Sequence, residues 1–153
     1  MADDNRHYTT YVNAPVDHVW DVLTSGPAQA DWYMPAVAWG LDVGAKVVWG
    51  SAAQVFVSGE VTAVRADVGF LSHTFRFPFL DEPPGLVRWR VTQMGQVTQV
   101  WLRHELVTRP ATDGIVGGSW PVMLARLKTL VETGSPMPEP VWPATEGWDT
   151  DPD

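Results

Sequence analysis

The chain of 153 residues contains no cysteine, which excludes a disulfide scaffold, a thiol nucleophile and a cysteine-bound zinc. Basic residues are also few, with ten lysines and arginines against eighteen acidic residues and a net charge of −8. Because nucleic acids and anionic membranes need a basic face to bind, neither is expected as a partner. Long apolar runs are absent, and the first residues lack the basic-then-apolar pattern of a signal peptide. These absences predict a cytoplasmic protein.

Common catalytic arrangements are missing as well. The sequence has no Gly-x-Gly-x-x-Gly, no P-loop and no His-x-x-x-His. Glu60 and Glu105 fall on outward-facing positions of their predicted strands, so a glycosidase-like pair of carboxylates is not supported. Ser119 lacks the glycine that follows a nucleophile elbow, and we interpret it as the N-cap of a helix. We therefore expect neither a cofactor nor a bound metal ion.

The composition of the chain divides it into two parts. Hydrophobic residues make up 45% and charged residues 18%, which predicts a globular domain with a sizeable core. Residues 135–153 instead hold five acidic residues, no basic residue and five prolines, which cannot continue a helix or a central strand. We predict one domain over residues 1–134 and an acidic, proline-rich tail over residues 135–153. Trp142 and Trp148 favour docking of this tail on the body or on a second subunit, so a homodimer is one alternative.

The spacing of apolar residues changes along the chain. Residues 7–13 alternate as in a strand, helical spacing follows Pro15, and a second short helix is predicted over residues 27–32. From residue 37 onward, apolar residues recur at every second position, which predicts strands over residues 37–43, 46–51, 54–65, 70–77, 86–93 and 96–107. A wide apolar face marks a long helix over residues 119–133, ended by Gly134. This order predicts an α+β fold in which the long helix packs on an antiparallel sheet of about seven strands.

A two-residue turn at Met94-Gly95 is predicted to join the last two strands. This turn would place Arg88 directly opposite Trp101 on the outer face of the sheet. We expect the Arg88 guanidinium to stack on the Trp101 indole. The alternative is that Trp101 belongs to an interface with the tail or with another subunit.

Several separated motifs resemble those of START-like (SRPBCC) domains. The segment from Asn13 to Thr24 resembles the opening of such a domain. The motifs that resemble the branch named after the activator of heat-shock protein 90 ATPase are Asp31-Trp32-Tyr33, Gly59-Glu60-Val61, Leu71-Ser72-His73-Thr74-Phe75 and Gly118-Ser119-Trp120-Pro121. The resemblance covers residues 7 to 134. It implies a helix-grip fold, in which a curved antiparallel sheet of about seven strands wraps a long C-terminal helix, with two short helices after the first strand, and encloses a cavity.

Alternation along the strands predicts which side chains face this cavity. The inward positions are apolar apart from two histidines, and they include Val55, Val57, Val61 and Ala63 on one strand. The expected ligand contacts are Phe75, Trp89, Val100, Leu102, Trp120, Met123, Leu124 and Leu127. Such a lining suits a small hydrophobic or aromatic molecule. The alternative is that these residues only fill a core.

His73 and His104 are the candidate catalytic residues, because both are predicted to face inward and histidine titrates near neutral pH. The alternative is a neutral imidazole that is hydrogen-bonded inside the fold. One strand lies between theirs, and two steps of ~4.8 Å put the strands ~10 Å apart, too far for a shared metal ion.

Three functions stay open at this stage. The apolar lining favours a binding module for a small apolar or aromatic molecule. A cavity histidine would suit a polyketide cyclase-like or hydrolase-like enzyme, as found in the superfamily that the chain resembles. The name of the branch implies a co-chaperone that acts on the heat-shock protein 90 ATPase.

Overall fold

A curved sheet of seven antiparallel strands forms the body of the protein, in the order β1-β7-β6-β5-β4-β3-β2. The structure is a computed structural model and describes residues 5–105, 109–141 and 151. The strands are β1 (Arg6–Val12), β2 (Ala36–Ala38), β3 (Lys46–Gly50), β4 (Val55–Arg65), β5 (Phe70–Phe75), β6 (Gly85–Met94) and β7 (Val97–Glu105). Their number and antiparallel pairing confirm the predicted sheet.

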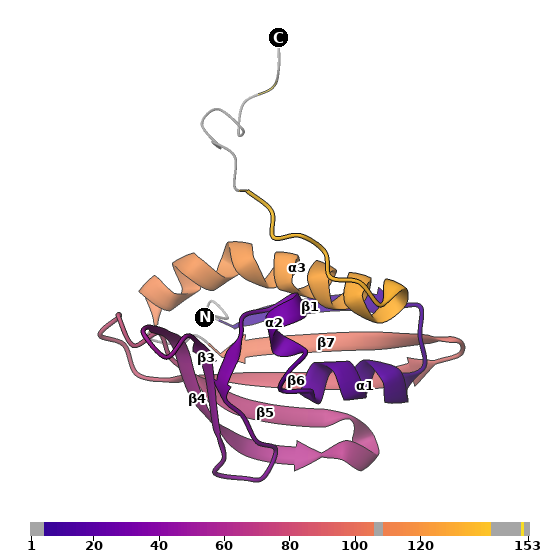
Figure 1. The fold of residues 1–153 in the computed structure, drawn as a ribbon, viewed down its shortest axis with the longest axis horizontal. Coiled ribbons are helices and arrows are strands. Elements are labelled where there is room, and N and C mark those ends of the chain that lie inside the picture. Colours follow the sequence, from indigo (N-terminus) through magenta and orange to yellow (C-terminus); the bar gives the residue numbers. More distant parts are fainter. Residues whose placement is uncertain (1–4, 106–108, 142–150, 152–153) are drawn as a thin grey trace.

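One long helix, α3 (Pro110–Thr133), lies along one face of the sheet (Figure 1). Two short helices, α1 (Val16–Thr24) and α2 (Gln29–Trp32), follow β1, and α2 contacts α3. A 3-10 turn, η1 (Ala66–Val68), joins β4 to β5. Within the described residues, no helix combines the length and apolar character needed to cross a membrane. The arrangement of one sheet around one long helix confirms the helix-grip fold.

The hairpin between β6 and β7 differs from the predicted one by one residue. Its loop consists of Gly95 and Gln96, with Gly95 at a φ of 63°, a conformation that glycine adopts without strain. Gln93 therefore pairs with Thr98, not with Gln96. The shift moves every cross-strand partner by two positions, and because two is the side-chain period of a strand, each residue keeps its predicted face.

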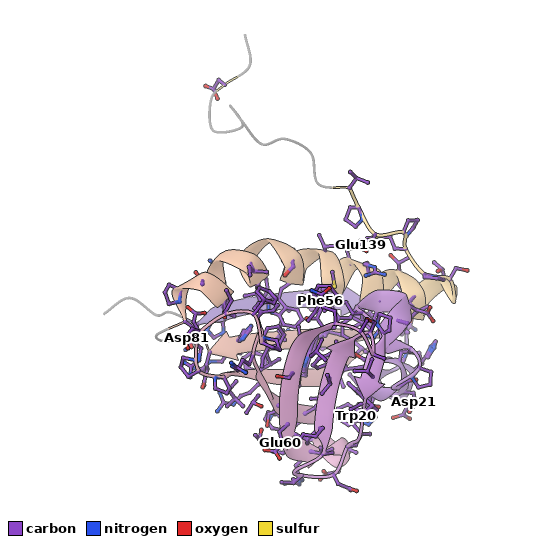
Figure 2. All side chains as sticks on the ribbon, turned by 60° about the vertical axis from the view of Figure 1, so that its left-hand side comes forward. Trp20, Asp21, Phe56, Glu60, Asp81 and Glu139 are labelled. Atoms are coloured by element: carbon purple, nitrogen blue, oxygen red, sulfur yellow. The ribbon has the colours of Figure 1, made fainter. Side chains whose placement is uncertain are left out.

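The start of α3 also differs from the prediction. The helix begins nine residues before Ser119, at Pro110, and the Ser119 hydroxyl bonds back to the carbonyls of Ile115 and Val116. The interpretation of Ser119 as an N-cap is therefore wrong. The first turn is instead capped from a distant loop by Glu82, whose carboxylate accepts hydrogen bonds from the backbone N–H groups of Ala111 and Thr112. Figure 2 labels the neighbouring Asp81, near this end of the helix.

Pro121 lies inside α3, where it cannot donate a backbone hydrogen bond to Gly117. The Gly117 carbonyl is reached instead by the Tyr8 hydroxyl of β1, at 3.3 Å. This contact from a different element compensates for the missing helical hydrogen bond. It allows the helix to continue through Pro121. The local sequence predicted a later start because a proline usually lies in the first turn of a helix.

Strand β4 contains an irregularity that changes which of its residues face inward. The register shifts between Val61 and Ala63, and Val64 then pairs with Leu71 and packs against the core. Ala63 is thus replaced by Val64 as an inward residue, and Val55, which is 38% exposed, does not belong to the core either. Both inward assignments were wrong: the bulge inverts the alternation at Ala63, and Val55 lies at the other end of β4, beside a second register shift against β3.

The glycine of the Gly59-Glu60-Val61 motif is required for a steric reason. A Cβ atom at this position would lie 2.0 Å from the carbonyl oxygen of Thr74 on β5. Only glycine lets the two backbones approach so closely. The motif therefore fixes the contact between β4 and β5, on the side of the sheet that carries His73.

The tail is described only in part. Residues 135–141 are exposed for the most part, and Glu139 lies on the side of α3 that faces away from the sheet (Figure 2). Trp142 and Trp148 lie outside the described residues, so their docking stays a prediction. The same holds for the inward position predicted for Leu106.

Candidate functional site

A small cavity lies between the concave face of the sheet, α2 and α3. Its volume is about 10 Å³, room for no more than one water molecule. Most of its wall is aromatic. The lining residues are Leu23, Gln29, Trp32, Tyr33, Trp39, Trp49, Leu71, His73, Trp89 and Trp120.

Gln29 fixes one wall of this cavity. Its side-chain amide donates to the carbonyls of Leu23 and Ser25, at 3.0 and 3.1 Å, and its oxygen accepts a hydrogen bond from the Trp49 indole at 3.1 Å. The side chain is 1% exposed, so each of these bonds replaces a bond to water that burial removes. Gln29 thereby ties α1 and α2 to β3.

His73 enters the cavity from β5 and has one unused nitrogen. Its Nδ1 lies 2.9 Å from the Thr74 carbonyl, so Nδ1 carries the proton and donates it, which leaves Nε2 as an acceptor. No described residue donates to Nε2. Burial lowers the pKa of His73 to about 4, since the charged form loses its hydration, while the bond to Thr74 opposes this shift. The imidazole is therefore neutral at physiological pH.

His104 lies on β7 in the same row across the sheet, because Val87 pairs with both histidines. It does not line the cavity. Its Nδ1 accepts the Trp120 indole N–H at 3.0 Å, which places its proton on Nε2, a buried atom without a partner among the described residues. Burial, and secondarily the neighbouring His73, lower the pKa of His104 to about 3. Both candidate catalytic histidines thus face inward as predicted, and one of them reaches the cavity.

Trp32 and Tyr33, at the end of α2, complete the cavity on the side of α3. The Trp32 indole N–H is buried and has no partner among the described residues. The Tyr33 ring is partly buried and lies nearly parallel to the rings of Trp32 and Trp120, at centroid distances of 5.7 and 5.8 Å. Burial among these rings raises the pKa of the Tyr33 phenol.

The eight predicted ligand contacts are all buried in one core, but most of them do not reach the cavity. Trp89 and Trp120 line it. Phe75, Val100, Leu102, Met123, Leu124 and Leu127 pack elsewhere between the sheet and α3. The sequence reasoning missed Gln29, Trp32, Tyr33, Trp39 and Trp49 as lining residues. The signal for two of them was the Asp31-Trp32-Tyr33 motif, which was noted as a family feature without a role in the site.

The outer face of the sheet does not contain the expected arginine–tryptophan stack. Arg88 pairs across from Arg103, and its guanidinium bonds to Glu105. Arg90 is the residue opposite Trp101, and its guanidinium lies over the Phe70 ring at 5.4 Å. The prediction of an Arg88–Trp101 stack is therefore wrong, because the hairpin loop is displaced by one residue.

The family model described as "Activator of Hsp90 ATPase homolog 1-like protein" matches residues 13–132. No curated protein matches the chain. Among solved structures, the crystal structure of DynU16, a protein in the dynemicin biosynthetic locus, is similar with a TM-score of 0.77 and 26% identity. That alignment covers 88% of this chain and 49% of DynU16, so the chain spans about half the length of that relative.

Two further structures share the fold. CalU16 from Micromonospora echinospora is similar with a TM-score of 0.72 and 22% identity, over 88% of this chain and 77% of CalU16. The Aha1 dimer from Colwellia psychrerythraea gives a TM-score of 0.70 and 15% identity, over 85% of this chain and 97% of that chain.

Proposed function

Because the chain belongs to the activator of Hsp90 ATPase homolog 1-like family, whose helix-grip fold packs a long helix across a concave sheet, we propose that it binds a small aromatic molecule between the two. The cavity lined by Trp32, Trp89, Trp120 and His73 is the binding site in this proposal, and because its volume is only about 10 Å³, the ligand has to displace side chains of the lining when it binds. Its aromatic walls suit a planar apolar ring, since aromatic side chains bind rings by offset stacking and edge contacts.

The observation that carries the proposal is a pair of unused polar atoms in this aromatic wall. The Trp32 indole N–H is a buried donor without a partner among the described residues, and the His73 Nε2 is an acceptor without one. Buried polar groups are normally hydrogen-bonded, and an unpaired one costs free energy that a ligand recovers when it supplies the partner. Trp32 and His73 both line the cavity, where a bound molecule can supply their partners, whereas His104, whose Nε2 also lacks a partner among the described residues, does not line it.

The nature of one structural relative supports the same proposal. DynU16 is described as a protein in the dynemicin biosynthetic locus, and it shares the fold over 88% of this chain. Catalysis by a cavity histidine is less favoured, because a pKa of about 4 makes His73 a weak base at neutral pH. Nδ1 of His104 already accepts a bond from Trp120.

Titration of the protein with 2-naphthol, followed by tryptophan fluorescence and calorimetry, tests the proposal. We expect saturable binding, and we expect His73→Phe to weaken it by about tenfold, since the variant keeps a ring but loses the acceptor. His18→Phe is the matched control, because His18 is exposed on α1. Naphthalene, which has no hydroxyl, should lose nothing on His73→Phe. Absence of saturable 2-naphthol binding to the wild-type protein would contradict the proposal, and consumption of the bound compound would replace it by the enzyme alternative.

We propose separately that the protein forms a homodimer. One structural relative is described as a dimer, and the tryptophans of the tail led us to consider a homodimer from the sequence. Light scattering of the full chain and of a chain ending at residue 141 tests it. A dimer that dissociates on truncation supports docking of the tail on a second subunit, and a monomer in both cases contradicts it.

A further inference from the structure

The Tyr33 ring lies in a slot against three tryptophan rings. Its plane lies 26° from that of Trp32 and 20° from that of Trp120. Trp89 stands nearly perpendicular to both of those tryptophans, at interplanar angles of 86° and 83°, and Trp49 meets Tyr33 edge-on at 5.4 Å. The protein therefore holds one planar ring of its own in a pocket built from four indoles.

Packing is the main interaction that holds this ring. No described residue forms a hydrogen bond with the Tyr33 hydroxyl, although burial raises the pKa of the phenol. Tyr33 is only partly buried and its hydroxyl is not one of the buried atoms without a partner, so no hydrogen bond to the described residues fixes the ring. Trp39, Trp49 and Trp120 by contrast each donate an indole hydrogen bond.

The backbone of Tyr33, unlike its ring, is held on both sides. Its N–H donates to the Gln29 carbonyl at 2.8 Å, and its carbonyl accepts a hydrogen bond from Arg126 of α3 at 3.0 Å. Arg126 is only 7% exposed, so a movement of the Tyr33 backbone would break a hydrogen bond that water could not easily replace. Rotation of the Tyr33 side chain is therefore the movement that empties the slot at the lowest cost, since it breaks no hydrogen bond.

We propose that Tyr33 is a built-in plug, and that the ligand of this protein is a planar hydroxylated aromatic molecule that takes the place of its ring between Trp32 and Trp120. Among the residues that line the cavity, only Tyr33 and Trp39 are partly buried, so solvent reaches the lining on the side of these two rings. With the ring turned out, one hydroxylated ring of the ligand enters the slot, and its hydroxyl supplies a partner for the Trp32 N–H or for Nε2 of His73. This inference rests on the proposed function and adds the class of ligand and the residue that controls entry.

Chemical rescue tests the plug directly. Tyr33→Ala removes a p-cresol-sized side chain, and p-cresol itself should then bind the vacated slot and raise the melting temperature of the variant. The control ligand 4-methylcyclohexanol has a similar size but no planar ring, so it should give little or no rise. The control variant Tyr11→Ala, at an exposed position, should show no rescue by either compound. Failure of p-cresol to bind or stabilise the folded Tyr33→Ala protein would contradict the proposal that the space of the Tyr33 ring binds a planar aromatic ring.

The affinity for 2-naphthol then separates the plug from the proposed function. Tyr33→Ala should bind 2-naphthol at least about tenfold more tightly than the wild-type protein, because no ring has to be displaced. Equal affinities would overturn the plug and leave the proposed function standing. Rescue by p-cresol without any 2-naphthol binding to the wild-type protein would overturn the proposed function and leave Tyr33 as a fixed part of the core. If Tyr33→Ala does not fold, Tyr33→Leu replaces it in the same comparison, because leucine vacates the planar slot and keeps apolar bulk.

Discussion

Replacement of His73 by glutamine should remove part of the acid sensitivity of the fold. In the unfolded chain this histidine has an ordinary pKa of 6.5, whereas burial lowers the pKa of His73 to about 4 in the folded protein. Between these two values the unfolded chain binds a proton that the folded protein does not bind. The free energy of unfolding therefore falls as the pH falls from 6.5 towards 4. Above pH 6.5 the neutral His73 causes no loss of stability. Glutamine cannot titrate, so the variant lacks this contribution to the slope.

The two pKa values determine the size of the effect. Relative to its value well above pH 6.5, His73 lowers the free energy of unfolding by about 1 kcal/mol near pH 6 and by between about 2 and 3 kcal/mol near pH 4.5. Native domains are stable by only about 5–15 kcal/mol, so the larger figure is measurable. His104 has a similarly lowered pKa and keeps its own acid sensitivity in both proteins. Because His73 contributes to the lowered pKa of His104, the difference between wild-type protein and variant reports His73 together with its coupling to His104.

Urea unfolding followed by tryptophan fluorescence, repeated across this pH range, measures the difference. His73→Gln has a fixed cost from its altered shape, which is the same at every pH and cancels when the pH dependences are compared. Parallel stability curves for wild-type protein and His73→Gln would refute the reasoning, because they would show that His73 titrates alike in the folded and unfolded chains.

Two further predictions concern hydrogen bonds that hold the site and α3. Gln29→Leu should lower the free energy of unfolding by about 3 kcal/mol, because the buried groups that Gln29 bonds on α1 and β3 lose their hydrogen-bond partner. The control is Gln54→Leu at an exposed position. An equal loss of stability in both variants would contradict the role of the Gln29 hydrogen bonds. Tyr8→Phe should cost about 1 kcal/mol in the wild-type protein and almost nothing in a Pro121→Ala background, where the new backbone N–H bonds to the Gly117 carbonyl. A double-mutant cycle in urea measures this coupling, and strictly additive costs would show that the hydroxyl does not replace the missing helical bond.

The faces of the strands could be predicted from the sequence because side-chain direction alternates with position, which is a local property. Trp89, His73 and His104 lie inward as expected, although the hairpin loop is displaced by one residue. The displacement changes pairing by two positions and so preserves every face, while it removes the expected contact between Arg88 and Trp101. Alternation fails only where β4 has a bulge, and the sequence pattern around Ala63 gave no sign of it.

The start of α3 and the lining of the cavity depended on contacts between distant segments. The helix begins at Pro110 because Glu82 caps it from another loop, and it passes Pro121 because Tyr8 reaches a carbonyl that the helix cannot satisfy. Which buried rings reach the cavity was likewise decided by the packing of α2 against α3, which brings Tyr33 and Trp120 together. A four-residue helix has too few turns to show a periodic pattern, so its role in the site was visible only once the chain was folded.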